Sequence, residues 1–209
     1  MNKNALTQAT KNMNPTKFYH GSATKISDGY LRPNKQFNNL QDKVVSAVFV
    51  TSAENRAKFF AIGRCISGGG HLSADGKTPR IYFEKLSCNI KPYFYIYTVY
   101  EDSDNHFTHD IGTGTTEYYA TKPIRIAKCH KYNTAQEIEK FGYEIYVLDE
   151  PLMNKFDLSK GENSAVRQEM RERIAQGKFH RVDIAKMIAQ QSAAKSCRIL
   201  AVKSERGND

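Results

Sequence analysis

Short runs of aromatic and β-branched residues, separated by polar or turn-forming residues, recur over most of the first 150 positions. Such runs suit the pleated, half-buried surface of a β-sheet. They predict strands at residues 17–20, 46–50, 80–86, 93–100, 117–120, 124–129 and 143–148. Because strands dominate and do not alternate regularly with helices, we expect an α+β fold rather than a βαβ layout.

Two helices are predicted in this region from the spacing of a capping box. Thr51 and Glu54 have the S/T-x-x-E spacing, and so do Thr134 and Glu137. In a capping box the two side chains satisfy free backbone amides of the first helical turn. We therefore expect one helix to begin near Ser52 and another near Thr134.

The pattern changes after Pro151, where apolar residues recur at helical spacing. These residues are Val166, Met170 and Ile174, followed by Ile184, Met187 and Ile188. We predict three segments: a flexible polar leader at 1–15, a domain with the candidate chemistry at 16–150, and a basic, mainly helical C-terminal section at 151–209. A last strand is expected at 199–202.

The composition is that of a globular protein, with 40% hydrophobic and 25% charged residues. No stretch approaches the roughly 20 apolar residues of a membrane helix, so we expect no membrane span. The polar leader lacks the apolar core of a secretory signal. This predicts a cytoplasmic protein, although delivery into a host cell by a specialised secretion route would leave no such mark.

The net charge of +9 is concentrated at the two ends of the chain. Residues 1–43 contain 7 basic and 2 acidic side chains, and residues 160–209 contain 11 and 6, whereas the middle is nearly balanced. Basic flanks can attract nucleic acid, acidic partners or anionic membranes. They can equally form a solvated surface that keeps the protein soluble.

Cysteine spacing argues against a metal site. The four cysteines are widely separated and form no C-x-x-C pair: Cys65, Cys88, Cys129 and Cys197. Neither a zinc site nor a disulfide framework is indicated. We expect reduced, structural thiols and no bound metal.

The first candidate functional segment is Phe18-Tyr19-His20-Gly21-Ser22. His20 ends a predicted strand directly before a glycine turn, where its imidazole can bond a ribose hydroxyl while the Gly21 backbone approaches a flat carboxamide. A turn-capping or surface histidine is the alternative interpretation.

Two further segments carry aromatic and acidic candidates. Phe49 lies near the end of the predicted strand at 46–50, and Thr51 follows it directly. An aromatic residue of the following helix can stack on a nicotinamide ring, although these rings can also be ordinary core. Glu117 begins a strand, which places a carboxylate either over a cleft or at an exposed strand end. The acidic, Gly/Thr-rich stretch at 101–116 before it is typical of binding loops.

Together these segments resemble the ADP-ribosyltransferase family, in particular the histidine-containing branch of the poly(ADP-ribose) polymerases and the rifampicin ADP-ribosyltransferases. The likeness covers roughly residues 17–130. It rests on F-Y-H-G at 18–21, V-x-V-T at 48–51, P-R-I-Y at 79–82 and K-P-I-R-I at 122–126. The resemblance implies split, mixed or antiparallel β-sheets around an NAD cleft, with a small helical C-terminal section.

The resemblance also implies roles for single residues. His20 would bind the NAD ribose, and Gly21 would hold the nicotinamide amide through its backbone. Phe49 stands where the family has a tyrosine, and Phe60 where polymerase-like members have an aromatic ring stacked on nicotinamide. Glu117 would be the catalytic acid.

Further positions follow from the same likeness. Ser22, Thr51 and Tyr118 flank these residues and are expected to contact the dinucleotide. Rifampicin-type enzymes take their catalytic acid from an earlier acidic loop, so Asp102 or Asp104 is the alternative to Glu117.

The activity implied is mono-ADP-ribosyl transfer, in which NAD is the substrate and nicotinamide is released, as in many effectors and toxins. A protein acceptor is favoured over a small molecule. Arginine-modifying members carry a Glu or Gln two residues before the catalytic one, where this chain has Thr115, which weakens an arginine target. The alternatives are a catalytically inactive or NAD-hydrolysing member, or an RNA 2′-phosphotransferase-like enzyme whose basic flanks bind nucleic acid.

Overall fold

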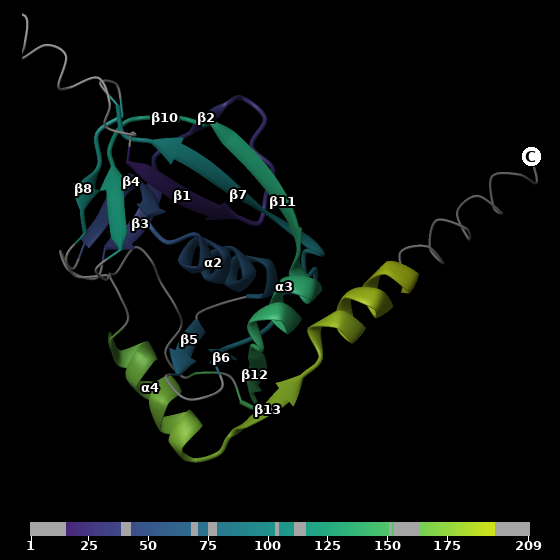
Figure 1. Ribbon diagram of the computed structural model, residues 1–209. Coiled ribbons are helices and arrows are strands. Elements are labelled where there is room, and N and C mark those ends of the chain that lie inside the picture. The colour runs from purple at the N-terminus through teal and green to yellow at the C-terminus, as the bar shows by residue number, and fades with distance from the viewer. Residues whose placement is uncertain are drawn as a thin grey trace, which may run out of the picture.

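The computed structural model describes residues 16–38, 43–67, 71–74, 79–102, 105–110, 116–150, 152 and 164–194. Its architecture is mixed α+β with mainly antiparallel sheets, as the sequence predicted (Figure 1). No helix in the described ranges is long and apolar enough to cross a membrane. The leader at 1–15 and the predicted strand at 199–202 lie outside the described residues.

The first sheet has seven strands in the order β11-β7-β1-β4-β9-β8, with β3 paired to β4. Their bounds are β1 Lys17–Ser22, β3 Asn34–Asn38, β4 Lys43–Thr51, β7 Tyr93–Tyr100, β8 Thr108–His109, β9 Glu117–Ala120 and β11 Lys128–Asn133. A two-stranded sheet joins β2 Tyr30–Leu31 to β10 Ile124–Arg125. The predicted strand at 124–129 is therefore two strands, which pair with different partners.

The second sheet has four strands in the order β13-β12-β6-β5. They are β5 His71–Ala74, β6 Arg80–Phe83, β12 Glu144–Leu148 and β13 Phe179–Val182, and only β12 and β6 run parallel. The C-terminal section thus adds the strand β13 to a sheet formed by earlier segments. It also contains α4 Ser164–Ala175 and a helix over 184–194, as the helical spacing predicted.

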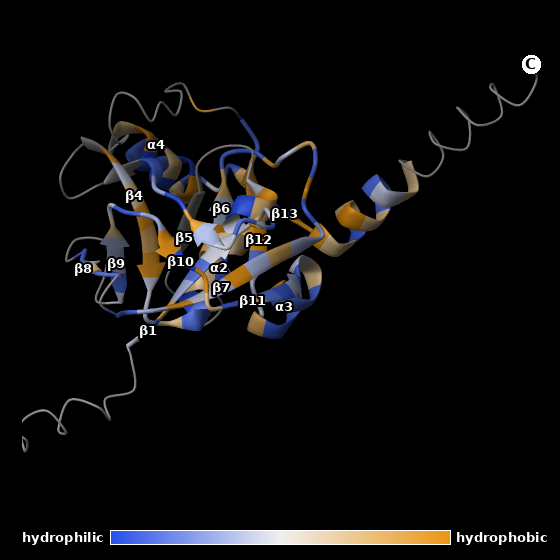
Figure 2. Ribbon diagram, turned by 90° about the horizontal axis from the view of Figure 1, so that it is seen from above, coloured by the Kyte–Doolittle hydropathy of each residue, from blue (hydrophilic) through white to orange (hydrophobic). Residues whose placement is uncertain are grey.

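Helix α2, Glu54–Ile66, lies between the two sheets (Figure 1). Its apolar face contributes Ala61, Ile62 and Ile66 to the largest core cluster, where they meet Ile96 of the first sheet and Phe83 of the second. Hydrophobic residues are prominent on β4 and β7, and hydrophilic residues on α3 and α4 (Figure 2). The apolar contacts of α2 with both sheets hold the helix in place, because burial of apolar surface drives folding.

The first predicted capping box is wrong. Helix α2 begins after Ala53, which makes no side-chain cap. Thr51 is still in β4, and its hydroxyl accepts a hydrogen bond from the Ala53 amide at 3.2 Å. The Glu54 carboxylate instead accepts a hydrogen bond from the hydroxyl of Tyr132 at 2.9 Å, so the acidic residue links α2 to β11 rather than capping its own helix.

The second capping box is displaced by one residue. Helix α3, Thr134–Phe141, is capped by Asn133, whose side chain accepts a hydrogen bond from the amide of Gln136 at 3.1 Å. Thr134 is buried and donates to the carbonyl of Lys91 at 2.8 Å. The helix was predicted correctly, but a tertiary contact takes the side chain expected to cap it.

Candidate functional site

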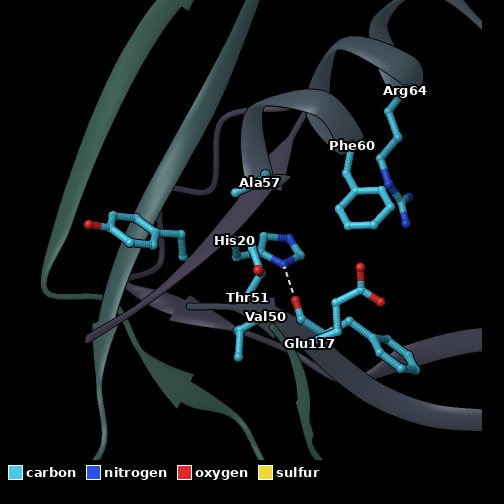
Figure 3. A pocket seen from close by; sticks show the side chains of 10 residues that line it. His20, Val50, Thr51, Ala57, Phe60, Arg64 and Glu117 are labelled. Carbon is cyan, nitrogen blue, oxygen red and sulfur yellow. Dashed lines mark hydrogen bonds between the residues drawn. The ribbon is translucent and has the colours of Figure 1, made fainter. Parts of the chain in front are cut away.

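The site begins where strands β1 and β4 separate. Strand β1 pairs with β7 along its whole length, from Lys17 to Ser22. Its pairing with β4 is confined to Tyr19 and Thr51. Beyond this point a hollow of about 210 Å³ opens between the strands, beside helix α2 (Figure 3).

This first hollow gathers residues from distant parts of the chain. Six of the predicted site residues line it: His20, Gly21, Phe49, Thr51, Phe60 and Glu117. Tyr19, Val50, Ala57 and Arg64 complete the lining. An imidazole, a carboxylate and aromatic rings therefore share one space, from β1, β4, α2 and the start of β9 (Figure 3).

The ring of His20 is oriented by the neighbouring strand. Its Nδ1 lies 2.8 Å from the carbonyl oxygen of Phe49. Since a carbonyl oxygen only accepts, Nδ1 carries the hydrogen, which leaves Nε2 as the acceptor of the neutral ring. Burial lowers the pKa of His20; the Phe49 carbonyl opposes this shift, and the positive charge of Arg64 adds to it. The ring is therefore neutral at pH 7 and is not the surface or turn-capping histidine of the alternative interpretation.

The lowered pKa makes stability depend on pH. An unfolded histidine titrates near pH 6.5, whereas folded His20 resists protonation. The unfolded state thus binds more protons below that pH, so the contribution of His20 to the free energy of unfolding is present at pH 7 and is lost as pH falls. The slope is at most about 1.4 kcal/mol per pH unit.

We expect His20→Asn to remove this part of the pH dependence, because asparagine keeps a donor for Phe49 but does not titrate. Urea unfolding at pH 7.5, 6.5 and 5.5 measures it. His130→Asn, on the exposed edge strand β11, is the matched control and should behave like the wild type. Identical pH profiles for the wild type and His20→Asn would contradict the burial of this ring.

Glu117 is a wall of the hollow rather than an exposed strand end. It is the first residue of β9, directly opposite Thr51 on β4, and only 7% of its surface is exposed. The alternative of a solvent-facing glutamate is therefore wrong. Its Oε1 accepts a hydrogen bond from Nε of Arg56 at 2.9 Å, in an ion pair that balances the buried charge.

Aromatic side chains form two more walls. Phe60 extends from α2 and Phe49 from β4, and both are half-buried. The guanidinium of Arg56 lies 4.7 Å from the centre of the Phe60 ring. A cation over a ring face adds attraction to the packing, so Arg56 contacts both an aromatic wall and the carboxylate.

The remaining predicted residues lie elsewhere. Ser22 lines an adjoining hollow, described below. The ring of Tyr118 packs against Phe18 and His109 and lines neither hollow. Asp102 also lies outside both hollows, and its carboxylate accepts a hydrogen bond from the backbone amide of Asn105 at 2.8 Å. Asp104 lies outside the described residues.

Two functional candidates were missed by the sequence analysis. Arg56 and Arg64 are four residues before and after Phe60 on α2, so the helical period places all three on one face. That signal was present in the sequence. What the sequence did not show was that this face looks onto the split between β1 and β4.

A second hollow, of about 130 Å³, adjoins the first and shares three of its lining residues: His20, Gly21 and Arg64. The rest of its lining is Ser22, Ile26, Leu31, Arg32, Asn34, Ala47 and Val48. Within the described ranges, no three His, Cys, Asp or Glu side chains are grouped to hold a metal ion. The described cysteines are free thiols, and burial raises the pKa of Cys65 to about 11.

Comparisons with protein-family models, with curated proteins and with solved structures found no match.

Proposed function

We propose that this protein is a mono-ADP-ribosyltransferase, which cleaves NAD in the first hollow, releases nicotinamide and transfers ADP-ribose to an acceptor. One observation carries the proposal. Three segments chosen from the sequence for this chemistry contribute His20, Phe60 and Glu117 to the same hollow, although they are far apart in the chain. In this proposal the opening between β1 and β4 in the first sheet corresponds to the NAD cleft of the ADP-ribosyltransferase fold.

The shape of the hollow suits the nicotinamide end of NAD. Its volume of about 210 Å³ is below the range typical of sites that enclose a drug-sized ligand. It suits a planar ring and its ribose better than the whole dinucleotide. Phe49 and Phe60 offer apolar walls for an offset stack on the ring, and Gly21 brings bare backbone to its edge.

The carboxylate of Glu117 supplies the main catalytic effect. As the bond between nicotinamide and the ribose anomeric carbon breaks, its electron pair leaves with nicotinamide, and positive charge grows on the ribose. A fixed carboxylate stabilises that charge more in the transition state than in bound NAD. The acceptor then bonds to the anomeric carbon, and its proton can pass to the same carboxylate.

His20 has a binding role in this mechanism. Because Nδ1 donates to the carbonyl of Phe49, Nε2 of the neutral ring is left to accept a hydrogen bond from a ribose hydroxyl. Phe49 replaces the family's tyrosine, so it offers an aromatic surface without a hydroxyl.

A second candidate function, RNA 2′-phosphotransfer, is favoured by one observation. That chemistry needs arginines near the nucleotide, and the sequence shows none beside His20. The fold nevertheless places Arg64 in the lining of the hollow and Arg56 against Glu117. We rank this function below ADP-ribosyl transfer because Arg56 is already paired with the carboxylate.

The two functions are separated by incubation of the purified protein with NAD labelled in its adenine half. The reaction is run alone, with a cell lysate, and with an RNA oligonucleotide carrying an internal 2′-phosphate. Nicotinamide is measured by chromatography, and the label is followed into macromolecules. We expect nicotinamide release together with transfer of the label to a protease-sensitive acceptor.

Each other outcome has a definite meaning. Release without labelling indicates an NAD hydrolase, and release that requires the 2′-phosphorylated RNA indicates the phosphotransferase. NAD binding without release indicates an inactive member of the fold. Absence of both binding and release would overturn the proposal.

A further inference from the structure

Arg64 occupies the junction of the two hollows. It lies in the last turn of α2 and lines the first hollow together with Phe60 and the second together with Ser22. The residue as a whole is exposed, while partial desolvation lowers the pKa of its guanidinium, which stays charged at pH 7. In the close view, Arg64 and Phe60 extend from α2 toward the side of the hollow that holds Glu117 (Figure 3).

Its position singles out Arg64 among the nearby cations. Arg32 lines the second hollow but not the first. Arg56, which is paired with Glu117, lines neither. Among the described residues, Arg64 is the one cationic side chain that lines both hollows.

A ligand that fills both hollows must carry a complementary group where they meet. His20 and Gly21 are the other shared residues, and neither brings a full charge, since His20 is neutral. A guanidinium favours an oxyanion there, and phosphate matches its planar fork of donors. In a dinucleotide the phosphates are the link between the two nucleoside halves.

We propose that Arg64 binds the phosphate groups of the ligand, and so makes the site select a dinucleotide over a nicotinamide nucleoside that lacks phosphate. This inference rests on the proposed function, because it places the nicotinamide ribose in the first hollow. The phosphates lie at the junction, and the rest of the dinucleotide extends into the second hollow.

The test compares two ligands that share the nicotinamide ribose and differ in phosphate. Binding of NAD and of nicotinamide riboside is measured by calorimetry for the wild type, Arg64→Ala and Arg64→Lys. Loss of a charged hydrogen-bond donor should weaken NAD binding by about 10- to 100-fold. The affinity for nicotinamide riboside should change less than about twofold, because this ligand has no phosphate. The difference between the two losses then isolates the contribution of the phosphates.

Two further measurements sharpen the test. Arg64→Lys should lie between the wild type and Arg64→Ala, because lysine keeps the charge but loses the planar fork. Raising the salt concentration should weaken NAD binding to the wild type more than to Arg64→Ala. The matched control is Arg125→Ala, an exposed arginine on β10 that lines neither hollow and should bind both ligands like the wild type.

The outcomes distinguish this inference from the proposed function. If the wild type binds NAD and Arg64→Ala binds it equally well, the role of Arg64 is overturned while the proposed function stands. Equal losses for NAD and nicotinamide riboside also overturn it, since they would place Arg64 against the nucleoside. A wild type that binds neither ligand overturns both.

Discussion

Replacing Glu117 by glutamine is expected to slow nicotinamide release from NAD by about 10²- to 10³-fold while the protein remains folded. The substitution keeps the shape of the side chain and an oxygen that can accept the hydrogen bond from Arg56. It removes the negative charge that would stabilise the cationic ribose. Because Arg56 is 41% exposed, its charge can be solvated once the ion pair is lost, so the cost in stability is small.

The measurement is a comparison of kcat and KM for nicotinamide release. A charge used mainly in the transition state should lower kcat and leave KM nearly unchanged. Glu54→Gln is the matched control: Glu54 lies at the start of α2, bonds Tyr132 and does not line the hollow. If Glu117→Gln retains full activity and Asp102→Asn loses it, the catalytic acid comes from the loop before β8.

Six residues that line the first hollow were named from the sequence, most of them beside a strand end or a turn. A histidine before a glycine turn is common by itself, whereas a glutamate beginning an otherwise apolar strand is costly unless it is paired or faces solvent. It was the order of the segments along the chain, which resembles that of the ADP-ribosyltransferase family, that indicated His20 and Glu117. His20 and Glu117 line the same hollow because β9 pairs with β4, which places Glu117 opposite Thr51. These two strands lie more than sixty positions apart in the chain.

The features that the sequence did not predict depend on contacts between residues far apart in the chain. Strand β13 was not predicted, because its four residues become a strand by pairing with β12. Arg56 was not assigned a role for the same reason, since its partner Glu117 lies 61 positions away. Tertiary contacts also displaced both predicted helix caps, where Glu54 and Thr134 bond to other elements instead.

The hollow itself depends on how closely α2 approaches β1, and this approach depends on one glycine. A β-carbon at position 21 would lie 2.1 Å from the carbonyl oxygen of Ala57 and 3.0 Å from the side chain of Ala61. The carbonyl belongs to the helix backbone, so the helix as a whole would have to move. Since Phe60 and Arg64 extend from the same helix, any such movement would change the walls of both hollows.

Gly21→Ala should therefore lower the free energy of unfolding by about 3 kcal/mol and the melting temperature by roughly 10 °C, with weaker NAD binding in the fraction that folds. Thermal unfolding followed by circular dichroism measures this. Ser22→Ala, next along β1, is the matched control, because its side chain bonds only to Thr24 in the described structure, and its melting temperature should stay near that of the wild type. The double variant Gly21→Ala/Ala61→Gly relieves the side-chain contact but not the contact with the Ala57 carbonyl, so it should recover little stability. A Gly21→Ala protein that melts with the wild type would show that α2 does not pack this closely on β1, and the hollow argued from that packing would lose its basis.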